Sequence, residues 1–102
     1  MIPVEKVKLI VNRHEALQRD LASGNLDKKD FVKKSKEYSN VEEVIEAAKG
    51  YINFEKENKE LSKIIEEKDG DSEMIKLAEA ELVELLSKQQ EFEKKLKIFL
   101  LP

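Results

Sequence analysis

The sequence predicts an all-α fold: an elongated antiparallel three-helix bundle whose long middle helix forms a coiled-coil-like hairpin with the third helix. Along residues 72–100, apolar side chains recur at alternating steps of three and four, which is the spacing of one helix face. Charged residues make up 40% of the 102-residue chain, which leaves few apolar side chains for a thick core. A single domain of long helices over residues 1–102 satisfies both observations.

The first helix is predicted over residues 3–22. Pro3 suits the first helical position, because it has no backbone N–H to leave unpaired there. Gly24 ends the run, since glycine readily adopts the left-handed conformation that often follows a helix. The stripe that faces a partner helix consists of Val7, Ile10, His14, Leu17 and Leu21.

The middle helix is predicted over residues 27–68, with Asp27 as its N-cap. Gly50 does not end it, because a lone glycine inside a helix costs only about 1 kcal/mol. Its apolar stripe shifts by one residue near the middle, which rotates the buried face. We therefore expect its first half to pack on the first helix and its second half on the third. The segment where all three helices meet is expected to contain Val44, Ile45, Ala48, Tyr51 and Ile52.

A break of the middle helix at Ser39-Asn40 is the alternative, because Asn40 followed by Glu43 resembles a capping box. A continuous helix is favoured because Tyr38 and Ile45 belong to the same stripe on either side of this point.

The third helix is predicted over residues 72–100, with Asp71 as its N-cap. Its stripe consists of Ala78, Leu82, Leu85, Gln89, Phe92, Leu96 and Phe99. The last three of these residues fall in the region where three helices meet. We expect them to be more buried than Ile64 or Met74, which lie where only two helices pack.

The sequence contains no pattern of catalytic, cofactor-binding or metal-binding residues. His14 is followed by Glu15, but Gln18 stands where a helical zinc pattern needs a second histidine, and the chain has no Cys. We therefore interpret His14 as a packed, hydrogen-bonded residue of the stripe, with a switch or ligand role as the alternative. The three glycines are scattered and form no phosphate-binding loop. No enzyme activity, cofactor or metal is expected of this chain.

Composition favours a cytoplasmic protein. The chain has no Cys for disulfides and no apolar run long enough for a signal peptide or a membrane span. The formal net charge of −3 argues against general attraction to nucleic acid. We expect neither membrane association nor direct sequence-specific binding of nucleic acid.

Two charge clusters at opposite ends of the predicted bundle are the candidate partner contacts. The first surrounds the turn between the second and third helices and consists of Glu66, Glu67, Asp69, Asp71 and Glu73. The second lies at the start of the middle helix and consists of Lys28, Lys29, Lys33, Lys34 and Lys36. For both clusters, ordinary solvated helix surface is the alternative.

Several segments resemble one known family. They are Arg13-His14-Glu15, Lys36-Glu37-Tyr38-Ser39, Asp71-Ser72-Glu73-Met74 followed by Ala78 and Glu81-Leu82, and the ending Leu96-Lys97-Ile98-Phe99-Leu100-Leu101-Pro102. Their order and spacing resemble the amino-terminal helical domain of the bacterial class I peptide chain release factors, in particular the release factor 1 branch. The resemblance covers the whole chain. Ser72 departs from it, since the family usually carries Pro at that helix start.

The resemblance implies a role in translation termination, as a domain that docks a release factor near the stalk base of the large ribosomal subunit. The implied partners are the ribosome, through the stalk-base protein, and the remaining domains of the same factor. The family reads stop codons and hydrolyses peptidyl-tRNA with later domains, the latter through a Gly-Gly-Gln loop, so the chain is expected to be a fragment without these activities. A free-standing helical coiled-coil adaptor or protein-interaction module is the alternative, since it would show the same periodicity.

Overall fold

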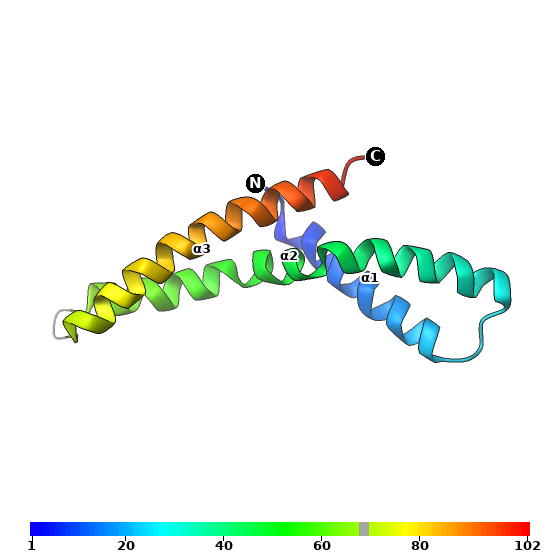
Figure 1. The fold of residues 1–102 in the computed structure, drawn as a ribbon, viewed down its shortest axis with the longest axis horizontal. Helices are drawn as coiled ribbons and strands as arrows, with labels where there is room; N and C mark the ends of the chain where they lie inside the picture. The colour runs from blue at the N-terminus through cyan, green and yellow to red at the C-terminus, as the bar shows by residue number, and fades with distance from the viewer. Residues whose placement is uncertain (68–69) are drawn as a thin grey trace.

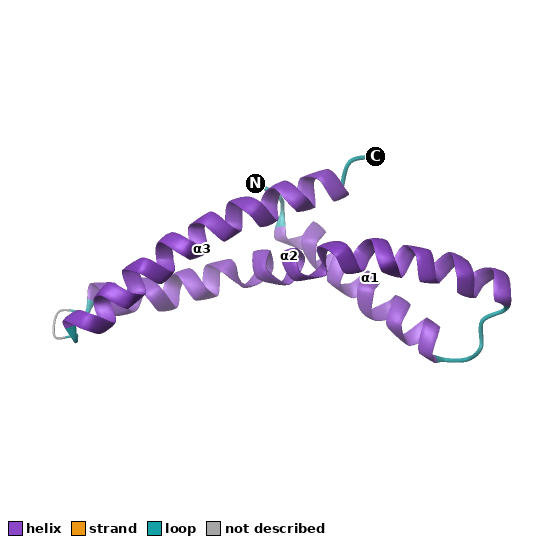
Figure 2. Ribbon diagram, in the orientation of Figure 1, coloured by secondary structure: helices purple, strands orange, loops and turns teal. Residues whose placement is uncertain are grey.

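The computed structural model describes residues 1–67 and 70–102. Within these residues it contains three helices and no strand: α1 (Val4–Ala22), α2 (Lys28–Glu66) and α3 (Ser72–Phe99) (Figure 2). The predicted all-α fold is therefore confirmed. Helix α2 is continuous at Ser39-Asn40, as predicted, so the alternative of a break there is wrong. Its predicted last residue, Lys68, lies outside the described residues.

Helix α2 is the central element of the molecule. Figure 1 shows α1 running back along the first half of α2 and α3 running back along its second half. The radius of gyration is 18.3 Å, whereas a compact domain of this size would have about 13 Å. The principal extents of 62 × 28 × 19 Å likewise describe an elongated molecule. The bundle consists of two antiparallel hairpins that share one long helix.

Side-chain caps begin the two longer helices. The carboxylate of Asp27 accepts a hydrogen bond from the backbone N–H of Asp30 at 2.8 Å. The carboxylate of Asp71 accepts one from the backbone N–H of Glu73 at 2.9 Å. Each bond satisfies a backbone donor that has no partner inside the helix, so both predicted N-caps are confirmed.

The first helix begins and ends by different means. Pro3 is the N-cap and not the first helical residue, so the prediction was wrong by one position. Its ψ of 131° is extended, which leaves Val4 as the first helical residue. After α1, Gly24 has a φ of +75°, a conformation that a residue without a Cβ adopts at little cost. This turn redirects the chain toward α2.

One continuous core joins the three helices. The buried apolar side chains in it are Ile2, Val7, Ile10, Leu17, Val41, Val44, Ala47, Ala48, Tyr51 and Leu96. Three residues of the predicted meeting segment, Val44, Ala48 and Tyr51, are buried, whereas Ile45 and Ile52 are partly buried. The rotation of the buried face along α2 thus places this segment between α1 and α3.

The predicted burial gradient along α3 is confirmed for Leu96. Leu96 is completely buried, and Met74 is 56% exposed, as expected. Phe92 and Phe99 are partly buried and therefore more buried than Met74, and Ile64 is partly buried as well. The Phe99 ring lines two open pockets beside α2.

Gly50 marks a close approach between α2 and α3. A Cβ atom at this position would lie 2.3 Å from Cε2 and 2.9 Å from Cδ2 of the Phe92 ring. Real Cβ atoms do not approach other carbons so closely, so the ring occupies space that only glycine leaves open. The close packing of the Phe92 ring therefore explains why α2 carries a glycine at this position.

Candidate interaction surfaces

A polar cluster lies between α1 and α2 on the buried side of α1. His14 is 6% exposed, and its ring stacks on that of Tyr38 with centroids 4.9 Å apart. Its Nε2 is hydrogen-bonded to the carboxylate of Glu42, and because an ionised carboxylate only accepts, Nε2 carries the proton. This bond lowers the pKa of Glu42 below its ordinary value. The interpretation of His14 as a packed, hydrogen-bonded residue is confirmed.

A bidentate ion pair lies beside this cluster, since Arg13 precedes His14 and Glu37 precedes Tyr38 in the sequence. The Arg13 guanidinium donates from Nε and Nη2 to the two carboxylate oxygens of Glu37 at 2.5 and 2.7 Å. These hydrogen bonds lower the pKa of Glu37. Both side chains are about half exposed, so the pair contributes more to the orientation of α1 on α2 than to stability.

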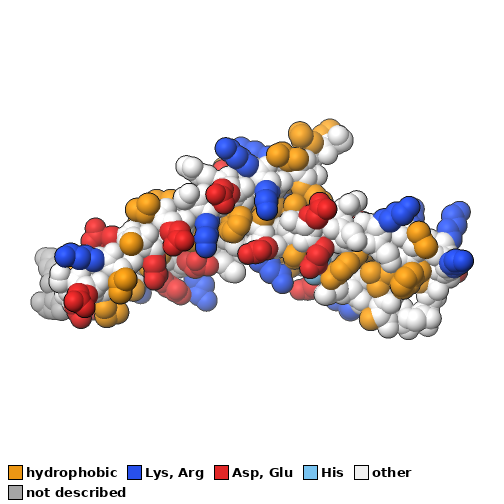
Figure 3. All heavy atoms as spheres, viewed as in Figure 1, with side chains coloured by type: hydrophobic (Ala, Val, Ile, Leu, Met, Phe, Trp, Pro, Cys, Tyr) orange, Lys and Arg blue, Asp and Glu red, His pale blue; other side chains and the backbone are white. Residues whose placement is uncertain are grey.

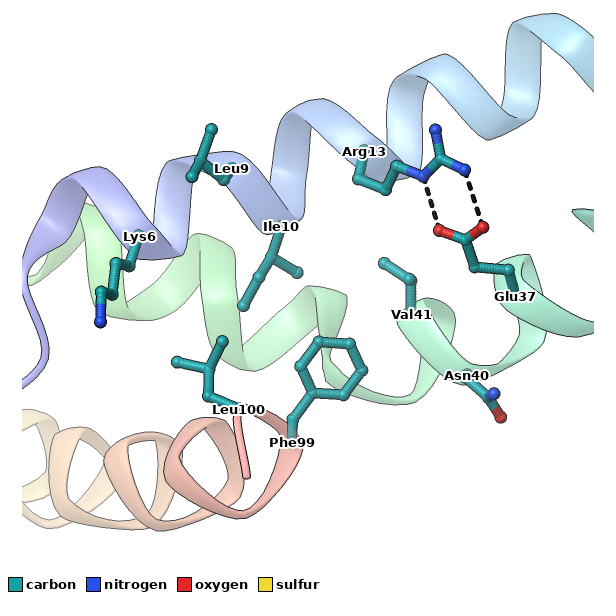
Figure 4. A pocket seen from close by; sticks show the side chains of 9 residues that line it. All are labelled: Lys6, Leu9, Ile10, Arg13, Glu37, Asn40, Val41, Phe99 and Leu100. Atoms are coloured by element: carbon teal, nitrogen blue, oxygen red, sulfur yellow. Dashed lines mark hydrogen bonds and ion pairs between the residues drawn. The ribbon is translucent and has the colours of Figure 1, made fainter. Parts of the chain in front are cut away.

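An open groove of about 580 Å³ lies beside this ion pair, between α1, α2 and the end of α3. Figure 4 shows Ile10, Val41 and Phe99 pointing toward the middle of the groove from three different helices. Its edge carries Lys6, Asn40 and the Arg13–Glu37 pair. The surface is apolar at its base and polar at its edge.

Sequence reasoning missed this groove. The available signals were Leu9, an apolar residue outside the predicted stripe that is 65% exposed, and Leu100, which lines the groove just after α3. Neither signal locates a groove unless the relative positions of the three helices are known.

The structure divides the predicted lysine cluster. Lys34 points toward α1, where its Nζ lies 2.6 Å from the Asp20 carboxylate and lowers the pKa of that group. The other members, Lys28, Lys29, Lys33 and Lys36, are exposed. Figure 3 shows lysine and arginine side chains gathered at this end of the molecule.

The acidic cluster lies at the opposite end, where α2 ends and α3 begins (Figure 1). Glu66, Glu67, Asp71 and Glu73 are exposed, and Asp69 lies outside the described residues. The carboxylate of Asp71 is already used as the N-cap of α3. Among the described acids at this end, Glu66, Glu67 and Glu73 have no such capping role.

The described part of the chain contains no group of three or more His, Asp or Glu side chains that could hold a metal ion. In the same residues, no helix combines the length and apolar character needed to cross a membrane. The candidate features described above are the groove, the lysines at one end and the acids at the other.

The sequence matches one protein-family model and several known proteins. Residues 10–102 match the family model of the PCRF domain. Over all 102 residues the chain is 44% identical to peptide chain release factor 1 of Pelagibacter ubique, of which it covers 29%. It is 36% identical over 93 residues, or 91% of the chain, to peptide chain release factor 1 of Orientia tsutsugamushi, of which it covers 26%.

A third relative is peptide chain release factor 1 of Acholeplasma laidlawii, 32% identical over 98 residues, which are 96% of this chain and 27% of the relative. The chain thus spans between about a quarter and a third of the length of these relatives. No solved structure matches it.

Proposed function

The chain belongs to the PCRF domain family, and on this basis we propose that it acts in translation termination as the amino-terminal domain of a peptide chain release factor. The observation that carries the proposal is the 44% identity to a release factor 1 over the whole chain. Matches to further release factors, over nearly the whole chain, support the same assignment. This evidence favours a release factor domain over a free-standing coiled-coil adaptor.

Its part in termination is binding and not catalysis. The glycines of the chain are Gly24, Gly50 and Gly70, so it contains no Gly-Gly-Gln segment. Its one histidine is buried and hydrogen-bonded to Glu42. Stop-codon reading and peptidyl-tRNA hydrolysis belong to the other domains of such a factor. Purified chain added to ribosomes that carry peptidyl-tRNA should release no peptide above background.

The ribosomal contact of the domain is a basic protein surface at the stalk base of the large subunit. The α2–α3 hairpin projects from the core, and its end carries exposed Glu66, Glu67 and Glu73. Glu66 and Glu67 stand at the negative end of the α2 dipole, where carboxylates are unfavourable. Helix stability therefore does not account for their presence, whereas attraction to a basic partner does.

The test is charge reversal in the full-length release factor. Glu66→Lys with Glu67→Lys should slow association with ribosomes, and the effect should be larger at low salt than at high salt because counterions screen such attraction. Glu15→Lys with Glu46→Lys makes the same charge change at exposed sites away from this end and should leave the rate nearly unchanged. Equal association rates of the first variant and the wild type in both buffers would rule out docking through these acids.

A further inference from the structure

We propose that the outward face of the first turns of α2 binds the phosphate backbone of RNA. This face, called the lysine face below, consists of Lys28, Lys29, Lys33 and Lys36 around Val32. The choice of RNA among polyanions rests on the proposed ribosomal function, since the ribosome presents RNA phosphates over much of its surface. The binding itself is independent of the acids at the other end of the molecule.

Helix geometry brings the four lysines to one side. With about 100° between successive residues, they fall within a sector of about 140°. Val32 lies inside this sector and is 46% exposed, so no carboxylate separates the ammonium groups. The four side chains extend over about 12 Å along the helix axis.

The nearby acids lie outside the sector of the lysine face. Asp20 pairs with Lys34, Glu37 pairs with Arg13, and Asp27 caps the helix. Asp30 is exposed one turn before Lys34, outside the sector of the lysine face. Among the described residues, no ion pair includes a residue of the lysine face. The lysine face itself thus carries only positive charge, and three of the four nearby acids are already bonded elsewhere.

Helix stability does not explain Lys28 and Lys29. Lys28 and Lys29 lie in the first turn of α2, where the positive end of the helix dipole disfavours cations. Lys29 and Lys33 stand four residues apart, so their like charges also repel each other along the helix. A surface that is unfavourable in the free protein is stabilised when an extended anion covers it.

A phosphate backbone suits this face better than a single anion. Its charges follow one another along a line, as the ammonium groups do on the helix. The lysine face offers flexible point charges and no bidentate or aromatic group for reading bases. Binding should therefore be independent of RNA sequence, and it agrees with the net charge of −3 because the acids are concentrated elsewhere.

The experiment is fluorescence anisotropy of two labelled RNA hairpins of unrelated sequence, titrated with the 102-residue chain at several salt concentrations. The wild type should bind both equally, and log K should fall with log[salt] with a slope near −3. The triple variant Lys29→Gln, Lys33→Gln, Lys36→Gln should lose at least about tenfold in affinity at low salt and most of the slope. The corresponding Lys→Arg triple should keep both, because it retains the charges.

The matched control is Lys56→Gln, Lys59→Gln, Lys63→Gln, which removes three exposed lysines from the other half of α2. It should bind RNA within about twofold of the wild type. Equal losses in the two glutamine triples, or no binding by the wild type, would overturn the proposal. Tighter binding of labelled polyglutamate than of RNA would overturn it in favour of an acidic protein partner. Each of these results leaves the ribosome-association test of the acidic end unaffected.

Discussion

The hydroxyl group of Tyr51 makes two hydrogen bonds to the backbone of Ile2. It accepts from the Ile2 N–H at 2.9 Å and donates to the Ile2 carbonyl oxygen at 3.0 Å. Both residues are 6% exposed, so water cannot easily replace either bond. Directly before Ile2 in the chain, the ammonium group of Met1 lies 2.8 Å from the carboxylate of Glu93 in α3. The segment before α1 is thereby fixed to both other helices.

Replacing Tyr51 by Phe should lower the free energy of unfolding by about 1 to 3 kcal/mol, because the backbone N–H and C=O of Ile2 would remain buried without partners. Urea denaturation followed by circular dichroism measures the change. Tyr38→Phe is the control, since its hydroxyl accepts an exposed bond from Gln18 at 3.2 Å and bonds the half-exposed Glu42 carboxylate, and water can replace both bonds. If the two variants lose the same stability, the Ile2 bonds contribute nothing specific.

These contacts show the limit of what the sequence predicts. The helices and the rotation of the buried face of α2 follow from apolar spacing, which is a local property. The Tyr51–Ile2 bonds, and the pairing of Lys34 with Asp20, depend on how far one helix is shifted along another. The Asp20 partner in particular removes Lys34 from the predicted lysine cluster. The spacing of apolar residues in the sequence does not give the shift of one helix along another. The groove beside Phe99 was missed for the same reason.

Leu96 tests the core where the three helices meet. Its side chain is completely buried, so Leu96→Ala should cost about 2 to 4 kcal/mol of unfolding free energy through lost burial and a cavity. Leu86 is 46% exposed on the same helix and serves as the control, and Leu86→Ala should cost less than about 1 kcal/mol. Similar losses in the two variants would mean that α3 does not pack at this junction as described.

Gly50→Ala should be destabilising, although alanine is the better helix former. The helix preference alone favours alanine by about 1 kcal/mol, but its methyl group would overlap the Phe92 ring. Overpacking of this kind typically costs about 1 to 3 kcal/mol. We therefore expect a net loss of stability in urea denaturation, and less loss when Gly50→Ala is made in a Phe92→Leu background.

Asn53→Ala controls for the helix preference, because Asn53 is exposed on the same helix. It should raise stability by a few tenths of a kcal/mol. A comparable gain in Gly50→Ala would show that the Phe92 ring moves aside freely and that the close approach of α2 and α3 does not require glycine.

The last prediction concerns acid stability and depends on the bond between His14 and Glu42. That bond lowers the pKa of Glu42 in the folded protein relative to the unfolded chain. The bond therefore contributes its full stabilisation at pH values above the ordinary glutamate pKa. This contribution declines as the pH falls through the lowered pKa of the folded state, below which Glu42 is protonated in both states.

Glu42→Gln removes this titration, so its stability should depend less steeply on pH in the acid range than that of the wild type. The difference between the two proteins should be largest near neutral pH and should shrink as acid is added. Urea midpoints measured across this range, with Glu43→Gln as the control, give the comparison. Glu43 is exposed and is in no ion pair within the described residues, so its variant should follow the wild-type curve. Parallel curves for Glu42→Gln and the wild type would show that the His14 bond does not couple protonation to folding.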